Sequence, residues 1–411
     1  MIKLLVIADD FTGALDTGVQ FSKQGISTLV STDIKINFSE VDNTLDVLVI
    51  DTESRYLNFE EAYELIHAII VCAKKNGIPY IYKKVDSALR GNISAEIKAV
   101  MDASKKSAIP FLPAYPEMNR VVVNGELYID QVLVSKSIFS KDPYEPVIES
   151  NVLRRLKMEA DIEGYLIEGT LPEMYNGILV FDAETNEDLE KQAEILEQEQ
   201  LLSISIGCAG FAKVLAEKLF PKGEVKSISL KKPLVVICGS VNPITRKQVD
   251  YIEQQNYPRV SLQSHQLLYP NYWNGREGKK EVADYLSLMT DQPLIVFETL
   301  SKETCLGIEQ HEQEQGRGGS DFRFKIGQSL GELTRAIWSK NCENTFLFTG
   351  GDTLFQSMNV LGVTQINPIA EISAGVVLSS IKWKDKKIQV ITKSGGFGKE
   401  QLFEEISQLT E

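Results

Sequence analysis

The chain has 411 residues, of which 43% are hydrophobic and 24% charged, as in an ordinary globular protein long enough for two domains. Its 57 acidic residues outnumber 43 lysines and arginines, and the net charge of −14 argues against non-specific binding to nucleic acid or an anionic membrane. Five widely spaced cysteines form no Cys-x-x-Cys pair, and neither a signal peptide nor an apolar run of ~20 residues is found. We therefore expect reduced thiols and a cytoplasmic location.

The first predicted strand, Ile2–Ala8, leads directly into two aspartates. Asp9 and Asp10 follow it, and a helix is predicted from about Ala14 to Gln24. Ligands of open α/β sheets collect at the carboxyl ends of the strands. At this edge the aspartates could orient hydroxyl groups, hold Mg²⁺ or act as a general base. Alternatively, they are a helix cap and a solvated acid.

Two further strands end in charged loops. Asp46–Ile50 leads into Asp51-Thr52-Glu53-Ser54-Arg55, and Pro79–Tyr82 leads into Lys83-Lys84-Val85-Asp86-Ser87-Ala88-Leu89-Arg90-Gly91-Asn92. The intervening segment, about Glu60–Lys75, is predicted to be a helix, which gives the strand–helix alternation of a parallel sheet. The second loop is either a solvated charge run or a pocket for a small anion, with Arg55 as a bidentate partner.

The alternation continues through strands at Ile109–Ala114, Gly177–Phe181 and Ser203–Ile206, and Asn119–Asp130 has the residues of a hairpin. Pro221–Lys232 is rich in Lys, Ser, Gly and Pro, which indicates a domain boundary. We therefore predict an α/β protein of two domains, residues 1–225 and 233–411, each a mainly parallel sheet flanked by helices.

The second half begins with a strand at Pro233–Cys238 and a helix at Ile244–Gln255. The polar, glycine-containing stretch Glu309–Asp321 is predicted to be a surface loop or, alternatively, a lid, and a helix follows at Ile326–Lys340. Strands at Gly375–Ile381 and Lys387–Thr392 are predicted to pair antiparallel.

Three predicted strands of this half end in glycine-bearing turns: Cys238-Gly239-Ser240-Val241-Asn242, Thr349-Gly350-Gly351-Asp352-Thr353 and Lys393-Ser394-Gly395-Gly396-Phe397-Gly398. Asp352 or Thr353 is placed to cap the helix Leu354–Leu361. A glycine turn before a helix aims backbone N–H groups at one point, where an anion can bind. Each turn alone could be an ordinary βα connection, but three of them indicate a nucleotide pocket.

Several common catalytic motifs are absent from the sequence. It contains no G-x-x-x-x-G-K-[ST] segment and no early G-x-G-x-x-G, which disfavours P-loop and dinucleotide enzymes. The three histidines, His67, His265 and His311, have no metal-ligand spacing, and no G-x-S-x-G elbow occurs. Redox, zinc and serine-hydrolase chemistry are therefore not expected.

Taken in order, six motifs resemble the four-carbon acid sugar kinase family, formerly a domain of unknown function, over nearly the whole chain. They are Ile7–Ala14, Lys84–Asn92, Pro113-Ala114-Tyr115-Pro116, Gly239-Ser240, Thr349–Thr353 and Lys393–Gly398. Two stretches depart from the family pattern. Asn242 stands where many members have a serine, which affects the adenosine side of the nucleotide site. Asn119-Arg120-Val121-Val122 replaces the commoner Gly-Arg-Thr-Thr, which affects which acid the protein accepts as its substrate.

The resemblance implies an N-terminal acid-sugar domain, a C-terminal ATP domain and phosphorylation of the C4 hydroxyl of threonate, erythronate or 2-oxo-tetronate. It also implies substrate contacts from Asp10, Arg55, Lys84, Val85, Asp86 and Ser87, and ATP contacts from Ser240, Gly350, Gly351, Asp352, Thr353 and Gly395. The partners it implies are a sugar acid and ATP. The net charge predicts no nucleic acid or membrane partner, and a homo-oligomer is left open.

For the mechanism, we expect Arg55 and Lys84 to hold the substrate carboxylate and Asp352 to bind Mg²⁺ directly or through water. Asp10 is the first choice for the base and Asp86 the second, and the active site is expected in the cleft between the domains. Two alternatives remain: a lyase or aldolase with a metal on Asp9 and Asp10, and a non-catalytic metabolite sensor.

Overall fold

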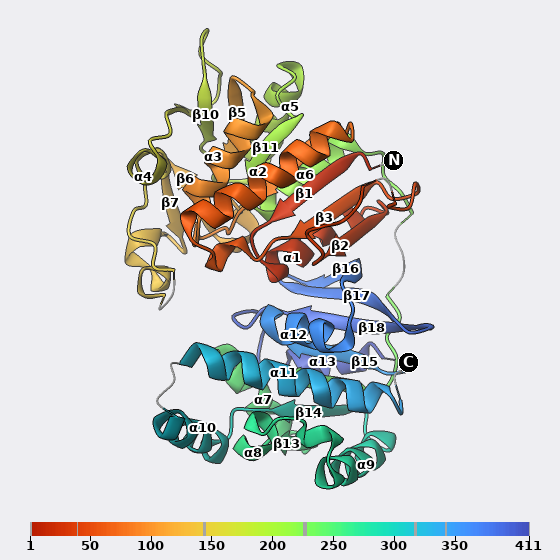
Figure 1. The fold of residues 1–411 in the computed structure, drawn as a ribbon. Coiled ribbons are helices and arrows are strands. Elements are labelled where there is room, and N and C mark those ends of the chain that lie inside the picture. Colours follow the sequence, from red (N-terminus) through yellow and green to blue (C-terminus); the bar gives the residue numbers. More distant parts are fainter. Residues whose placement is uncertain are drawn as a thin grey trace. The chain divides into compact units, whose positions relative to one another are not determined.

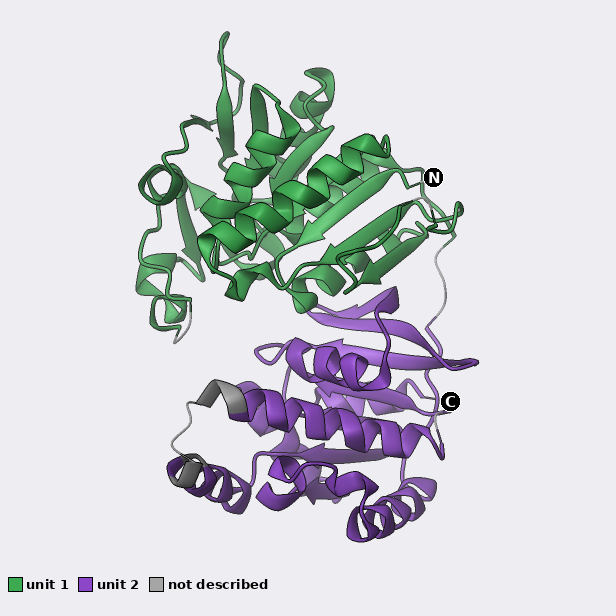
Figure 2. Ribbon diagram, in the orientation of Figure 1, with its two compact units in different colours: residues 1–225 green, residues 226–411 purple. Residues whose placement is uncertain are grey.

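The structure is a computed structural model that describes residues 2–38, 40–142, 145–224, 228–315, 319–341 and 343–410. The chain folds into two compact units, Met1–Val225 and Lys226–Glu411 (Figure 2). Each unit contains its own sheet with helices packed against it (Figure 1), and the predicted α/β class is confirmed. Within the described residues, none of the helices is both long and apolar enough to cross a membrane.

The main sheet of the first unit is parallel throughout, in the order β2-β3-β1-β4-β11-β5-β10-β9. Its strands are β1 (Leu4–Ala8), β2 (Thr28–Ser31), β3 (Val47–Asp51), β4 (Tyr80–Lys84), β5 (Ala108–Leu112), β9 (Gly164–Ile167), β10 (Gly177–Phe181) and β11 (Ile204–Gly207). The sequence LLVIA of β1 is buried along its whole length, as expected for a strand covered on both faces. β1 lies between β3 and β4, so the loops that follow these three strands are neighbours.

The helices of this unit pack in two groups: α2 with α3 and α4, and α1 with α6 and α5. Their bounds are α1 (Phe11–Ser22), α2 (Phe59–Lys75), α3 (Ile93–Ser104), α4 (Val152–Ala160), α5 (Asn186–Gln198) and α6 (Ala209–Leu219). α2 begins at a capping box in which Asn58 accepts the N–H of Glu61 and the Glu61 side chain accepts the N–H of Asn58. This cap fixes the end of the loop that carries Arg55.

A small antiparallel sheet forms in the same unit from β6 (Arg120–Val123), β7 (Glu126–Ile129) and β8 (Val132–Leu133). The hairpin predicted at Asn119–Asp130 is therefore confirmed. A single antiparallel bridge between Val122 and Ala183 joins this sheet to the segment after β10. The small sheet thus places Arg120 near the main sheet without sharing a ladder with it.

The sheet of the second unit has the order β13-β14-β12-β15-β18-β17-β16. Its strands are β12 (Leu234–Cys238), β13 (Arg259–Ser261), β14 (Leu294–Glu298), β15 (Thr345–Thr349), β16 (Gln365–Ser373), β17 (Val376–Trp383) and β18 (Lys386–Lys393). Pairing is parallel from β13 to β18 and antiparallel across β18, β17 and β16, which confirms the predicted antiparallel pair. The carboxyl ends of β12, β15 and β18 are therefore adjacent.

The helices of this unit are α7 (Pro243–Gln254), α8 (Ser264–Leu268), α9 (Arg276–Thr290), α10 (Lys302–Gln315), α11 (Gly319–Trp338), α12 (Gly351–Leu361) and α13 (Leu402–Gln408). The loop predicted at Glu309–Asp321 is wrong over most of its length, because α10 runs to Gln315 and α11 starts at Gly319. Glu and Gln are good helix formers, so a polar stretch rich in them continues a helix. Residues 316–318 of that prediction lie outside the described residues.

Candidate active site

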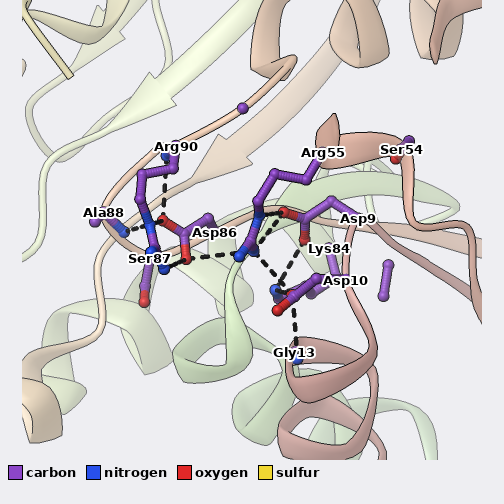
Figure 3. A network of polar contacts seen from close by, with 12 residues as sticks. Asp9, Asp10, Gly13, Ser54, Arg55, Lys84, Asp86, Ser87, Ala88 and Arg90 are labelled. Atoms are coloured by element: carbon purple, nitrogen blue, oxygen red, sulfur yellow. Dashed lines mark hydrogen bonds and ion pairs between the residues drawn. The ribbon is translucent and has the colours of Figure 1, made fainter. Parts of the chain in front are cut away.

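Charged side chains from the ends of β1, β3 and β4 meet at one edge of the first unit (Figure 3). Asp9 and Asp10 come from the first loop, Arg55 from the short 3-10 helix Ser54–Tyr56, and Lys84 and Asp86 from the end of β4 and its loop. The sheet order thus brings together residues that lie far apart in the sequence.

Arg55 is the centre of this cluster. Its Nε and Nη2 atoms lie 2.9 and 2.6 Å from Asp9 Oδ2, and Nη2 also lies 2.8 Å from Asp10 Oδ1 and 3.5 Å from Asp86 Oδ1. Lys84 Nζ lies 2.9 Å from Asp9 Oδ1 and 3.0 Å from Asp10 Oδ1. The guanidinium and the ammonium are almost completely buried, so their charges depend on these carboxylates for compensation.

Asp10 differs from the other carboxylates of the cluster in exposure and in the use of its oxygens. Its side chain is 15% exposed, against 2% for Asp9 and 8% for Asp86. Every contact it makes with the described part of the chain is to Oδ1, which accepts the N–H of Gly13 at 3.1 Å and faces Arg55 and Lys84. The second oxygen, Oδ2, is left to accept a proton donor from a ligand.

Asp86 is held by Arg90, whose Nε and Nη2 donate to its two oxygens at 2.9 and 3.0 Å. Burial alone would raise the pKa of the Asp86 carboxyl, but the charges of Arg90 and Arg55 outweigh it and hold that pKa well below its usual range. For the same reason, the pKa of Asp9 is lowered despite burial, by Arg55 and Lys84. Both groups therefore remain ionised and are weak bases.

A buried ion pair stabilises the segment that carries Arg55. Lys83 Nζ lies 2.9 Å from Glu96 Oε2, and neither side chain has any exposed surface. The hydroxyl of Ser54 donates to Glu96 Oε1, and Asn92 donates to the carbonyl of Ser54 at 2.9 Å. Because Ser54 precedes Arg55, these contacts fix the 3-10 helix that delivers the guanidinium.

Two predicted contact residues take different positions around this cluster. Val85 is buried and donates its N–H to the carbonyl of Gly207 at 2.8 Å, so only its carbonyl remains for a ligand. The Ser87 hydroxyl accepts a hydrogen bond from Arg120 Nη1. The guanidinium of Arg120 also lies 5.6 Å from the centre of the Phe139 ring, and that of Arg90 lies 5.1 Å from it.

Glu53 is a site residue that the sequence did not single out. Its backbone is left-handed, with φ of 46°, which is uncommon for a residue other than glycine and often marks a functional position. Its Oε1 accepts the N–H of Phe11 at 3.1 Å. Burial, reinforced by the charge of Asp10, raises the pKa of Glu53 to about 7. In the sequence, only the position of Glu53 just after a predicted strand could have indicated that it lies at the site.

In the second unit, the three predicted glycine turns come together. A Cβ added to Gly395 would lie 2.6 Å from Ser240 Oγ, and one added to Gly350 would lie 3.8 Å from Ser240 Cβ. The N–H of Gly350 donates to the carbonyl of Lys393 at 2.8 Å, which joins the turns after β15 and β18. Ser240, Gly350 and Gly395 therefore line one place at the carboxyl edge of this sheet.

The helix that follows β15 starts earlier than predicted. α12 begins at Gly351, its N-cap is Gly350 with φ of 89°, and no side chain caps it. Asp352 and Thr353 thus lie in its first turn instead of capping it, and Thr353 Oγ1 donates to the carbonyl of Thr349 at 3.0 Å. The side chain of Asp352 is half-exposed and pairs with Arg323. An uncapped N-terminus beside a glycine turn is suited to an anion such as phosphate.

The clustered carboxylates of the first unit are paired with basic side chains. No group of three or more His, Cys, Asp or Glu side chains that could hold a metal ion occurs among the described residues. Asp9 and Asp10 are paired with Arg55 and Lys84, and a divalent cation would have to displace these charges. This arrangement disfavours the metal-dependent lyase.

Comparison with known proteins identifies the family of each half of the chain. A sugar-binding N-terminal domain model matches residues 4–215, and a nucleotide-binding C-terminal domain model matches residues 235–403. Two crystal structures share the fold: one from Salmonella typhimurium is 24% identical with a TM-score of 0.80 and covers 99% of each chain. The other, from Haemophilus influenzae, is 24% identical with a TM-score of 0.75 and covers 98% of this chain and 99% of its own.

Curated relatives include a D-threonate kinase of Salmonella typhimurium, 26% identical over 97% of this chain and 96% of its own. A 3-oxo-tetronate kinase of Haemophilus influenzae is 27% identical over 97% of this chain and 98% of its own. A D-erythronate kinase of Heliobacterium modesticaldum is 27% identical over 74% of this chain and 72% of its own. The chain belongs to the four-carbon acid sugar kinase family, as predicted.

Proposed function

We propose that this protein is an ATP-dependent kinase that phosphorylates the terminal C4 hydroxyl of a four-carbon sugar acid. The observation that carries the proposal is that Asp10, at a charge-balanced strand edge, is partly exposed and accepts its hydrogen bonds from Gly13 and Lys84 through Oδ1, which leaves Oδ2 for the substrate. The names of the relatives support threonate, erythronate or an oxo-tetronate as the substrate.

On the acid side, Asp10 accepts the proton of the attacking hydroxyl through Oδ2. Arg55 and Lys84 attract the substrate carboxylate, and the hydrogen bonds of Arg55 to Asp9 and Asp86 come from Nε and Nη2, which leaves Nη1 as a donor for the substrate. Ser87 and the Val85 carbonyl complete the hydrogen bonds to the substrate hydroxyls. Asp86 orients Arg55 and Arg90 and is not the base, because its pKa is held low.

On the nucleotide side, Ser240, Gly350, Gly351, Thr353 and Gly395 form the phosphate site. The N-terminus of α12 has no side-chain cap, so the N–H groups of Gly351 and Asp352 are available to phosphate oxygens, and the glycines let the phosphates approach the backbone closely. Asp352 would hold Mg²⁺ directly or through water once its ion pair with Arg323 has opened, and the ion would offset the charge of the transferring phosphoryl group.

We also infer a cytoplasmic location. ATP is a cytoplasmic substrate, and Cys72, Cys208, Cys238 and Cys305, the cysteines that the structure describes, are free thiols.

Turnover on a panel of acids tests the function. With ATP and Mg²⁺, we expect ADP release on at least one of D-threonate, D-erythronate and 3-oxo-tetronate, and none when the acid or Mg²⁺ is omitted. Release of ADP is followed by a coupled assay, and the product is identified as a 4-phosphate by mass spectrometry and NMR. Binding of ATP and acid without ADP release would indicate the sensor, and consumption of acid without ATP would indicate the lyase.

Gly395→Ala tests the phosphate site. The added Cβ would lie 2.6 Å from Ser240 Oγ and 3.2 Å from Asn242 Cβ, so Ser240 has to move. We expect the KM for ATP to rise roughly tenfold or more, equivalent to about 1.4 kcal/mol, with the KM for the acid unchanged. The KM for the acid is the internal control, because Gly395 belongs to the second unit. An unchanged KM for ATP would contradict the assignment.

A further inference from the structure

Lys393 is a buried lysine without an acidic partner. It ends β18, its side chain has no exposed surface, and it forms no ion pair with a carboxylate among the described residues. Its Nζ instead donates to the Thr245 hydroxyl and to the carbonyl of Gly395, each at 3.0 Å. An ammonium group in this position is costly unless a negative charge compensates it.

The two oxygen atoms that accept from Lys393 belong to the phosphate site proposed above. The Thr245 hydroxyl also donates to the carbonyl of Gly395, at 2.9 Å, and lies 3.4 Å from Ser240 Oγ. Both Lys393 and Thr245 thus hold the Gly395 carbonyl on the inner side of the turn. In a trans peptide the C=O and the N–H point in opposite directions. The N–H of Gly396, which shares this peptide, is therefore directed outward.

The N–H of Gly396 has no partner among the described residues, and Gly396 itself is exposed. If the Gly395–Gly396 peptide turned over, its carbonyl would face the phosphates instead and would repel them. The orientation of this single peptide thus decides whether the turn attracts or repels an anion.

We propose that Lys393 is a positioning residue for the nucleotide: it holds the Gly395–Gly396 peptide with its N–H outward, and the phosphates of a nucleoside triphosphate provide the missing counter-charge. This inference rests on the proposed function of the second unit. It adds a residue that does not touch the solvent-exposed surface of the site and acts through Thr245 and Gly395.

The surroundings of Lys393 support a dependence on pH. Burial lowers the pKa of Lys393 to about 8, and the titratable group that faces it is the Cys238 thiol of β12, whose own pKa burial raises to about 11. The charge of Glu298, on the neighbouring strand β14, also raises the pKa of the Cys238 thiol. Without nucleotide, the ammonium therefore loses its proton as the pH rises through about 8. Bound phosphate favours the charged form, so nucleotide affinity is highest below pH 8 and falls above it.

The test is calorimetric binding of ATP, without sugar acid and at fixed free Mg²⁺, to the full-length protein and to Lys393→Met. At pH 7 we expect Lys393→Met to bind ATP roughly 10- to 100-fold more weakly, with a melting temperature equal to or above that of the unmodified protein. We expect the affinity of the unmodified protein to fall between pH 8 and 9 and that of Lys393→Met to stay level. Lys387→Met, an exposed lysine of the same strand, is the matched control.

Lys393→Met binding within twofold of the unmodified protein, or losing affinity with pH in parallel with it, would overturn the inference. Failure of the unmodified protein to bind ATP would instead overturn the proposed function, and the inference with it. Should Lys393→Met not fold, Thr245→Val decides, since it removes the hydroxyl and keeps the ammonium. It is expected to bind several-fold more weakly and to retain the fall between pH 8 and 9, and unchanged affinity would again overturn the inference.

Discussion

Replacing Asp10 by Asn is expected to lower kcat by a factor of about 10²–10⁴ and to leave ATP affinity almost unchanged. The substitution keeps the size of the side chain and keeps an oxygen that can accept the N–H of Gly13, so α1 retains its cap. It removes the carboxylate oxygen Oδ2 that is accessible to the substrate hydroxyl. Steady-state kinetics with the preferred acid, together with ATP binding by calorimetry, measures both quantities.

The comparison with Asp86→Asn makes this test specific. Asp86 accepts hydrogen bonds from Nε and Nη2 of Arg90 and faces Arg55, so its replacement should lower the melting temperature and raise the KM for the acid as well as reduce turnover. A normal kcat for Asp10→Asn would exclude Asp10 as the base. A larger loss of kcat in a fully folded Asp86→Asn variant would transfer that role to Asp86.

Arg55→Ala is expected to lower the free energy of unfolding of the first unit by about 3–5 kcal/mol, in addition to raising the KM for the acid. From the sequence, only the effect on KM is expected. The structure adds the larger effect, because the guanidinium is buried and compensates Asp9, Asp10 and Asp86. For a unit of this size the loss corresponds to a decrease of roughly 6–20 °C in melting temperature, which calorimetry of the whole chain can detect.

The matched control is Arg154→Ala. Arg154 is 61% exposed and pairs with Glu149 at 3.3 Å, so its removal should cost no more than about 1 kcal/mol. Arg55→Lys separates charge from geometry: it keeps a cation but loses the fork that reaches several carboxylates at once. We expect it to recover part of the stability and little of the acid affinity. Equal melting temperatures for Arg55→Ala and Arg154→Ala would show that the cluster is not held together by Arg55.

The strand ends could be predicted because their signal is local. Each buried apolar run stops at a polar residue, as at Ala8 before Asp9, and parallel strands place such ends at one edge. The gathering of the three glycine turns followed from the same rule. The residue contacts did not follow from it, because Arg55 meets Asp9 across 46 positions of sequence and only the sheet order makes them neighbours.

Two other features could not be predicted, for different physical reasons. Lys393 precedes a glycine turn, and nothing local indicates that its charge is fully buried or that its donors turn inward to Thr245 and Gly395. The loop predicted at Glu309–Asp321 is wrong because the prediction relied on local polarity alone. Most of it is helical because its Glu and Gln residues favour the helix more than their polarity favours an irregular connection.

The small antiparallel sheet has an evolutionary consequence. It brings Arg120 to Ser87 and is joined to the rest of the unit through isolated bridges such as Val122 to Ala183 and Glu126 to Asn151. Substitutions at its half-buried positions, such as Val121 and Tyr128, therefore leave the carboxylate cluster and the strands of the main sheet in place. Enzymes on this scaffold could in this way come to use different four-carbon acids by exchanging a few residues of one peripheral hairpin, while the machinery of phosphoryl transfer is inherited intact.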